Sequence, residues 1–267
     1  MKDLAPAAIA EAEGLAAILA SAVDLDSAVH TTRKGTKRLR SFLRLARQSI
    51  GTDVYRTENA ALRDTARLIA PARDALVLIE TAGEMSASEP VLALLGRLHL
   101  EEMALLESGV RAEATGRLTS IASRWSALDW RGPEVASIRA GLTRTYRRGL
   151  ADFAAVQSQP SASAFHSWRR RVKYVRHQLE ALGAPTKLTK QWLALGDDLG
   201  WEHDHAVLIG VCSEYRGDDG FRSVAEHSKA RREMLRSAAL EAGDQLLVLE
   251  PRDFVESVAS VVGLEER

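Results

Sequence analysis

The sequence reads HTTRKGTKRLR from His30 to Arg40 and HSWRRRVKYVR from His166 to Arg176. Both segments follow the pattern H-x-x-R-[KR]-x-x-K-x-x-R, where x is any residue. The second segment begins 136 residues after the first in a chain of 267 residues. An offset of about half the chain indicates an internal duplication, and such a duplication fixes the architecture.

Each segment predicts an amphipathic helix with a basic face. At about 100° per residue, the basic side chains share one side of the helix, and apolar side chains such as Leu39 and Trp168 lie opposite. The basic face consists of His30, Arg33, Lys34, Lys37 and Arg44 in the first helix, and of His166, Arg169, Arg170, Lys173 and His177 in the second.

Acidic residues are absent around both segments. No Asp or Glu occurs from Ser27 to Thr52 or from Phe153 to Leu179. Like charges three or four residues apart on a helix repel each other, whereas a solvated helix surface usually mixes both signs. The duplicated basic faces therefore predict surfaces that meet a polyanion. A solvated basic face without a ligand is the simpler interpretation.

The overall composition gives the chain no charge bias. It has 36 Lys and Arg against 36 Asp and Glu, so a general attraction to nucleic acid is not implied. The single cysteine, Cys212, excludes an intramolecular disulfide and is expected in the core. Neither a signal peptide nor a run of about 18 uncharged apolar residues is found, so we expect a cytoplasmic protein without a membrane segment.

The sequence predicts an all-α fold. Ala, Leu, Arg and Glu dominate, and alternating runs of β-branched residues are absent. Asp24 or Asp26 is expected to cap the first basic helix and Ser163 the second, and a helix break is expected near Gly116. The residues expected in the core, and not as stacking platforms, are Trp125, Trp130, Trp168, Trp192 and Trp201.

The repeat extends beyond the basic helices. The run from Ala72 to Ile79 parallels the run from Glu202 to Ile209, at an offset of 130 residues. A helix over about 187–199 is expected to end before a new helix begins at Glu202. Each half therefore contains a basic helix, an intervening helix and a short helix that starts with Arg-Asp or His-Asp.

These relations predict one domain of two pseudo-symmetric halves, about 1–132 and about 133–267. The two basic helices are expected to face each other or to line a shared groove. Asp74 and Asp204 are expected to orient Arg or His side chains by hydrogen bonds.

The chain resembles the CHAD family, the conserved-histidine α-helical domain, from about residue 10 to 245. Beyond the two basic segments, the resemblance is carried by Tyr55-Arg56-Thr57-Glu58-Asn59, Leu62-Arg63-Asp64, Ala72-Arg73-Asp74-Ala75, Tyr146-Arg147-Arg148, Phe165-His166, Leu195-Gly196-Asp197-Asp198-Leu199-Gly200 and His203-Asp204. The two H-x-x-R segments together are specific, whereas either one alone is weak.

The resemblance implies two pseudo-symmetric four-helix bundles with a basic groove or pore between them. It implies non-enzymatic binding of inorganic polyphosphate and association with polyphosphate granules, without a metal or other cofactor. Gly35, which is expected to interrupt the first basic helix, and Arg38, which stands where the second has Tyr174, make the halves unequal. The expected polyphosphate-binding residues are His30, Arg33, Lys34, Lys37, Arg38, Arg40, Arg44, Arg73, Arg147, Arg148, His166, Arg169, Arg170, Lys173, Tyr174, Arg176, His177 and His203.

A metal-dependent phosphohydrolase that acts on polyphosphate or nucleotides is a second hypothesis. His203-Asp204 resembles the HD pair of such enzymes, and His166, His177 and His205 are further candidate ligands. The matching position in the first half is Arg73, and an arginine side chain does not ligate a metal.

A nucleic-acid-binding module is a third hypothesis, and a purely structural bundle with a solvated basic face is a fourth. The balanced net charge and the lack of aromatic residues between the basic ones make nucleic-acid binding the weaker choice. The sequence leaves open the oligomeric state, the preferred chain length of the polyphosphate and the participation of divalent cations.

Overall fold

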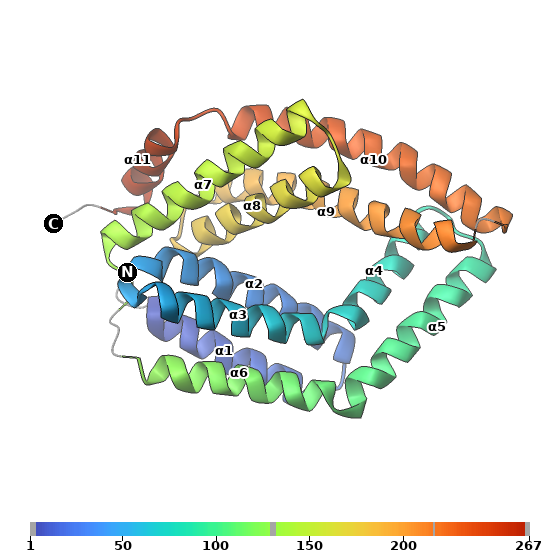
Figure 1. Ribbon diagram of the computed structural model, residues 1–267, viewed down its shortest axis with the longest axis horizontal. Helices are drawn as coiled ribbons and strands as arrows, with labels where there is room; N and C mark the ends of the chain where they lie inside the picture. The colour runs from blue at the N-terminus through green and yellow to red at the C-terminus, as the bar shows by residue number, and fades with distance from the viewer. Residues whose placement is uncertain (1–3, 129–131, 216, 265–267) are drawn as a thin grey trace.

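The computed structural model describes residues 4–128, 132–215 and 217–264, and within these ranges it contains helices and turns but no strand. The prediction of an all-α fold is therefore confirmed. In chain order (Figure 1) the helices are α1 (Leu4–Ser21), α2 (Leu25–Ile50), α3 (Thr52–Leu68), α4 (Ala70–Glu84), α5 (Glu89–Leu105), a π-helical turn (Leu106–Val110), α6 (Arg111–Ser126), α7 (Val135–Ser158), α8 (Ala162–Ala181), α9 (Thr186–Cys212), a 3-10 turn (Ser213–Tyr215), α10 (Asp219–Leu246) and α11 (Pro251–Val262).

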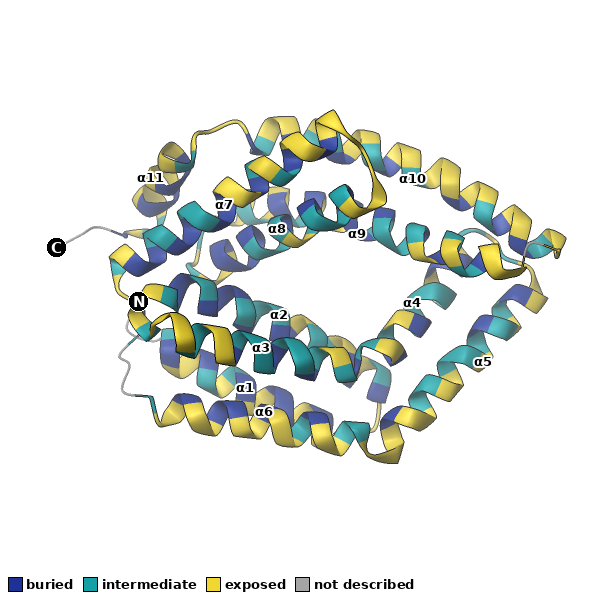
Figure 2. Cartoon of the chain, viewed as in Figure 1, coloured by how far each residue is buried: buried dark blue, intermediate teal, exposed yellow. Residues whose placement is uncertain are grey.

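The first bundle is made of α1, α2, α3 and α6. Both α1 and α3 pack against α2 and α6. The apolar faces of these helices form one core, which includes Leu15, Leu43, Leu62, Leu118 and Trp125. Figure 2 shows that the outer face of α6 is largely exposed, as expected for a helix with one apolar side.

The second group of helices is made of α7, α8, α9 and α10, with α11 packed on α7. Its core includes Tyr146, Trp168, Trp192 and Phe254, and the ring of Tyr146 stacks on that of Phe254 at 3.9 Å between centroids. Leu45 of α2 also belongs to this core, so the basic helix α2 contributes apolar side chains to the cores of both halves. The predicted pseudo-symmetry of the halves stays a prediction.

The two halves meet at two places. At one place α2 packs against α7 and α8, and at the other α4 and α5 reach the far ends of α9 and α10 (Figure 1). The second junction has its own apolar core, which includes Leu95, Leu208 and Phe221. Cys212 is buried in this core, as the sequence predicts.

The tryptophan predictions are confirmed for three residues. Trp125, Trp168 and Trp192 are fully buried, and Trp201 is half-buried in α9. Trp130 lies outside the described residues.

One expected helix boundary is wrong. The helix α9 runs without a break from Thr186 to Cys212, so His203 and Asp204 lie inside a helix and not at its start. The glycines at this point are tolerated because they are buried against α8: a Cβ on Gly200 would lie 3.9 Å from the Lys173 Nζ. The corresponding stretch of the first half does break, at Ile69 between α3 and α4.

Three local expectations need correction. Gly35 does not interrupt α2; it lets α1 approach closely, because a Cβ there would lie 2.5 Å from the Leu15 Cδ1. The N-cap of α8 is Ser161 and not Ser163, since the Ser161 side chain accepts a hydrogen bond from the Ala164 amide. The break expected near Gly116 lies instead at Gly109, whose φ of 139° suits only glycine.

Two further features concern the start of the chain. Asp24 caps α2 by accepting a hydrogen bond from the Ser27 amide at 3.0 Å, so of the two candidate caps, Asp24 and Asp26, the first is the N-cap. The helix α1 is long and apolar enough to span a membrane by length and composition alone. One face of α1, including Leu15 and Leu19, is buried in the core of the first bundle, and core helices pass the same criterion. The absence of a membrane segment stays a prediction.

Candidate functional site

The basic faces of α2 and α8 approach each other where the two helices pack. Arg33 and Lys37 of α2 and Arg169 and Lys173 of α8 form what we call the central cluster. Burial and the charges of Arg33 and Arg169 lower the pKa of Lys37 to about 8. Burial and the charges of Arg169 and Lys37 lower the pKa of Lys173 to about 7. The four cations thus lie within electrostatic reach of one another across the junction, and an open groove between them stays a prediction.

Two carboxylates hold the arginines of the central cluster in place. The Arg33 guanidinium donates a hydrogen bond to the Asp74 carboxylate of α4 at 2.9 Å, and the Arg169 guanidinium lies 3.8 Å from the Asp204 carboxylate of α9. Arg33 and Arg169 hold the same position in the two basic segments, and Asp74 and Asp204 hold the same position in the runs 72–79 and 202–209. The pair within the first half therefore has its counterpart within the second half. This arrangement agrees with the expected orienting role of the two aspartates.

The histidines that begin the two basic segments lie at the edge of the central cluster. The His166 Nδ1 lies 3.4 Å from the His203 Nδ1, and His30 is exposed near Arg73. Burial, followed by the charges of Arg169 and His166, lowers the pKa of His203 to about 3. Burial and neighbouring cations also lower the pKa values of His30 and His166. Without a ligand these imidazoles are mainly neutral at pH 7, so each offers one donor and one acceptor.

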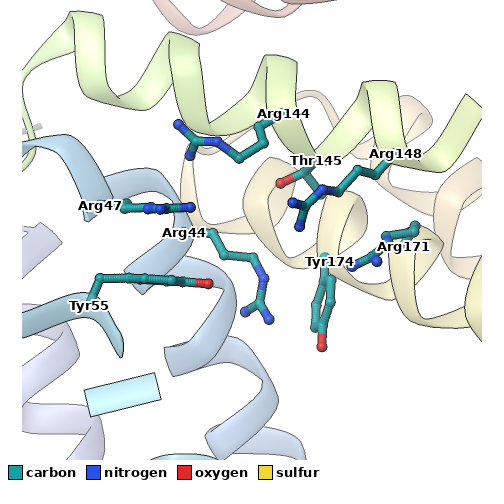
Figure 3. Close-up of a pocket in the computed structure, with 8 residues that line it drawn as sticks. All are labelled: Arg44, Arg47, Tyr55, Arg144, Thr145, Arg148, Arg171 and Tyr174. Atoms are coloured by element: carbon teal, nitrogen blue, oxygen red, sulfur yellow. The ribbon is translucent and has the colours of Figure 1, made fainter. Parts of the chain in front are cut away.

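A second group of cations lines a pocket between the two halves, shown in Figure 3. We call it the arginine pocket. Side chains from four helices point into it, and none of them is acidic. They are Arg44 and Arg47 from α2, Tyr55 from α3, Arg144, Thr145 and Arg148 from α7, and Arg171 and Tyr174 from α8.

Two tyrosine rings hold two of the pocket arginines. The Arg44 guanidinium lies 3.7 Å from the centroid of the Tyr174 ring, and the Arg47 guanidinium lies 5.0 Å from that of Tyr55. Burial would raise the pKa of Tyr174, but Arg44 and the neighbouring guanidinium of Arg40 outweigh it, and the pKa is lowered. Cation–π contacts of this kind orient a guanidinium without neutralising it.

The remaining pocket arginines are only partly neutralised. The Arg171 side chain donates a hydrogen bond to Asp152 at 3.1 Å. Burial, followed by the charges of Arg47 and Arg148, lowers the pKa of Arg144. The pocket therefore concentrates positive charge in a partly desolvated place, where an anion is attracted more strongly than in open water.

Tyr174 links the arginine pocket to the central cluster along α8. Its hydroxyl is within electrostatic reach of Arg40 and Arg170 as well as of the pocket arginines. Arg170 is exposed, and Lys173 is the residue of α8 directly before Tyr174. The basic surface therefore continues from the pocket toward the central cluster. Among the charged neighbours of Tyr174 in the described residues, none of those that shift its pKa is acidic.

The structure does not bring all of the predicted residues together. Arg38 turns toward α1 and donates a hydrogen bond to Glu11 at 2.6 Å. Arg176 and His177 are buried, and both bind Glu180, whose pKa falls to about 2 chiefly because of the His177 hydrogen bond.

Two other predicted residues lie beside the basic surface. Arg73 is paired with Glu80 at 2.9 Å and remains close to His30. Arg147 is exposed on α7 and, unlike Arg148, does not line the arginine pocket. Exposed Lys34 and Arg170 flank the central cluster on α2 and α8.

Sequence reasoning missed five side chains of the arginine pocket: Arg47, Tyr55, Arg144, Thr145 and Arg171. One signal was present, because residues 135–151, which include Arg144, contain no Asp or Glu. The signal was weak because the cations of α7 lie 90 or more residues from those of α2, and only packing joins them.

Within the described residues, no group of three or more His, Cys, Asp and Glu side chains could hold a metal ion. His203 contacts His166, and Asp204 faces Arg169, so the His-Asp pair is directed toward the basic surface. A phosphohydrolase of the HD type needs a larger set of ligands, and this hypothesis gains no support from the geometry.

Comparisons with known proteins agree on one family. The model of the CHAD domain family matches residues 8–213. The chain is also similar to the crystal structure of the CHAD domain from the plant Ricinus communis, with a TM-score of 0.54 and 18% sequence identity over 99% of this chain and 91% of that chain. At this identity the likeness shows the fold alone. A search of curated proteins finds no match.

Proposed function

Because the chain belongs to the CHAD family, we propose that it binds inorganic polyphosphate through the central cluster and the basic residues around it. The proposal includes binding without turnover and, in the cell, association with polyphosphate granules in the cytoplasm. It assigns the binding that the resemblance implies to named side chains.

One observation carries the proposal: Lys37 and Lys173 are gathered on facing helices although burial and the neighbouring cations disfavour the charge of both lysines. The cations of this surface outnumber the carboxylates that pair with them, which are Asp74 and Asp204 in the central cluster and Glu80 beside Arg73. Burying like charges together is unfavourable unless a counter-charge compensates. A polyanion supplies that counter-charge at every point along the surface.

Polyphosphate suits such a surface physically. It is a flexible chain with about one negative charge per internal phosphate, and its neutralisation releases condensed counterions, as with a nucleic-acid backbone. Arginines such as Arg33 and Arg169 offer a planar fork to phosphate oxygens, and the lysines offer a compact charge. Neutral His30 and His166 add hydrogen bonds at the edge.

The proposal is tested by titrating the protein with long-chain polyphosphate at two salt concentrations. The double variant Lys37→Glu, Lys173→Glu should lose most of its affinity and show a shallower dependence on salt. The matched control is Lys187→Glu, Lys190→Glu, which makes the same change of charge on exposed positions of α9. Equal affinities for the two double variants would refute the proposal.

Two further measurements separate polyphosphate binding from the competing functions. RNA should compete poorly with polyphosphate at equal phosphate concentration, and effective displacement by RNA would favour a nucleic-acid-binding module. Incubation of polyphosphate with the protein and divalent cations should release no phosphate, and a release that depends on Asp204 would favour the phosphohydrolase.

A further inference from the structure

The arginine pocket differs from the central cluster in its shape and composition. The central cluster presents cations from two facing helices, with a carboxylate beside each arginine. The pocket collects five guanidinium groups from three helices around one small space, and none of its lining side chains is acidic (Figure 3). Among the ion pairs of the described residues, only that of Arg171 with Asp152 holds a pocket arginine.

One lining residue of the pocket is a buried threonine whose hydroxyl is already hydrogen-bonded within the protein. The Thr145 hydroxyl donates to the Gly141 carbonyl at 2.9 Å and accepts from the Gln178 side chain at 3.1 Å. Arg144 and Arg148 stand one turn apart on α7, on either side of Thr145. A ligand that enters therefore meets the charged donors of five arginines, while the threonine hydroxyl has no free donor to offer.

The two kinds of phosphate in a linear polyphosphate chain fit such a space differently. An internal phosphate carries one negative charge and continues in both directions. A terminal phosphate continues in one direction only, has three non-bridging oxygens and carries a second charge near neutral pH, as a phosphate monoester does. A small pocket lined by five guanidinium groups and by no acidic side chain matches the higher charge and the additional oxygen of the terminal phosphate.

We propose that the arginine pocket binds the terminal phosphate of a linear polyphosphate chain, so that the protein holds the chain by one end. This inference rests on the proposed function. From the pocket the chain runs past Tyr174 toward the central cluster. Arg44 and Lys37 are seven residues apart on α2, which corresponds to about 10 Å along the helix. The subsequent phosphates of the same chain therefore reach Lys37 and Lys173.

The test compares long-chain polyphosphate with free ends and the same polymer with both ends capped as alkyl phosphoramidates. Capping removes the second charge and one terminal oxygen and leaves the internal phosphates unchanged. We expect the capped polymer to bind about tenfold more weakly, in proportion to the loss of charge-assisted hydrogen bonds. Cyclic trimetaphosphate, which has no end, should compete less well than linear tripolyphosphate.

Variants on one helix connect the end preference to the pocket. Arg144→Gln should reduce the ratio between the affinities for free-ended and capped polymer to about one. Arg147→Gln, three residues away and outside the pocket, should change the affinities for both polymers by the same factor and so keep that ratio. Arg148→Gln, at an exposed position of the pocket wall, repeats the test in case Arg144→Gln folds poorly.

The outcomes separate the two proposals. Equal binding of capped and free-ended polymer by the unaltered protein would overturn the inference and leave the proposed function standing. Failure of both polymers to bind would overturn both. An end preference that survives Arg144→Gln and Arg148→Gln would place the chain end elsewhere and would also overturn the inference.

Discussion

Lys37 of α2 and Lys173 of α8 lie across the junction of the two halves, and the charge of Lys37 helps to lower the pKa of Lys173. They occupy the same position in the two repeated segments, and the packing of α2 on α8 brings Lys37 within electrostatic reach of its counterpart Lys173. Burial of the two side chains is the largest cause of the lowered pKa of each lysine.

Binding of polyphosphate should take up protons. The pKa values of Lys173 and Lys37, about 7 and about 8 in the free protein, rise when a polyanion binds beside them. Well below pH 7 both lysines are protonated with or without ligand. As the pH rises from about 7 to about 9, the free protein loses protons that binding must restore, so the apparent affinity falls.

Calorimetry at pH 8 in two buffers of different ionisation enthalpy measures this uptake. The double variant Lys37→Arg, Lys173→Arg keeps its charge throughout this range and should take up far fewer protons. An uptake of zero in the unaltered protein would contradict the prediction.

Removing the same two charges should stabilise the ligand-free protein. Folding lowers the pKa of each lysine, so the folded state is destabilised wherever the same lysine is protonated in the unfolded chain. This destabilisation disappears as the unfolded chain loses its protons, so the free energy of unfolding should rise between pH 7 and pH 10. Lys37→Met together with Lys173→Met removes the cost at pH 7 and should add about 2 kcal/mol to the free energy of unfolding. Urea unfolding at pH 7 and pH 9.5 checks both statements, and the variant should lose polyphosphate binding. A destabilised variant would show that the lysines are structural.

Neutralising one carboxylate should strengthen binding. Asp204→Asn keeps an acceptor for Arg169 but removes a negative charge from the basic surface. Affinity for polyphosphate should rise by a few-fold, and the slope of log affinity against log salt should become steeper by about one unit. Asp219→Asn, at an exposed position at the start of α10, is the control. A weaker complex with Asp204→Asn would mean that the carboxylate itself is needed to position Arg169.

The close packing of α7 on α2 should not tolerate a side chain at Gly141. A Cβ on Gly141 would lie 2.6 Å from the carbonyl oxygen of Arg44, a backbone atom that cannot move independently. Gly141→Ala should therefore destabilise the protein by about 2 kcal/mol and distort the arginine pocket. Gly116→Ala in α6 is the matched control, because no atom lies within 4 Å of its Cβ position, and it should stabilise by about 0.5–1 kcal/mol. Equal unfolding free energies would contradict the expected contact.

The candidate site could be predicted in part. The helical period places Arg33, Lys37, Arg169 and Lys173 on the basic faces, because they are spaced to lie on one side of a helix. The same period placed His177 on that face, but α8 is buried there and His177 binds Glu180. A helical wheel shows a direction around the axis and does not show which neighbour covers it.

What the sequence by itself determined is local and periodic: the all-α class, the two repeated basic segments, the start of α2 near Asp24 and Asp26, and the direction of the two basic faces. These follow from the spacing of residues within one helix. The tertiary structure alone decided that α9 continues through Gly200, that Arg38 pairs with Glu11, and that Arg44 and Arg144 share a pocket. Such contacts join residues far apart in the chain, and they depend on how helices pack, which no single segment encodes.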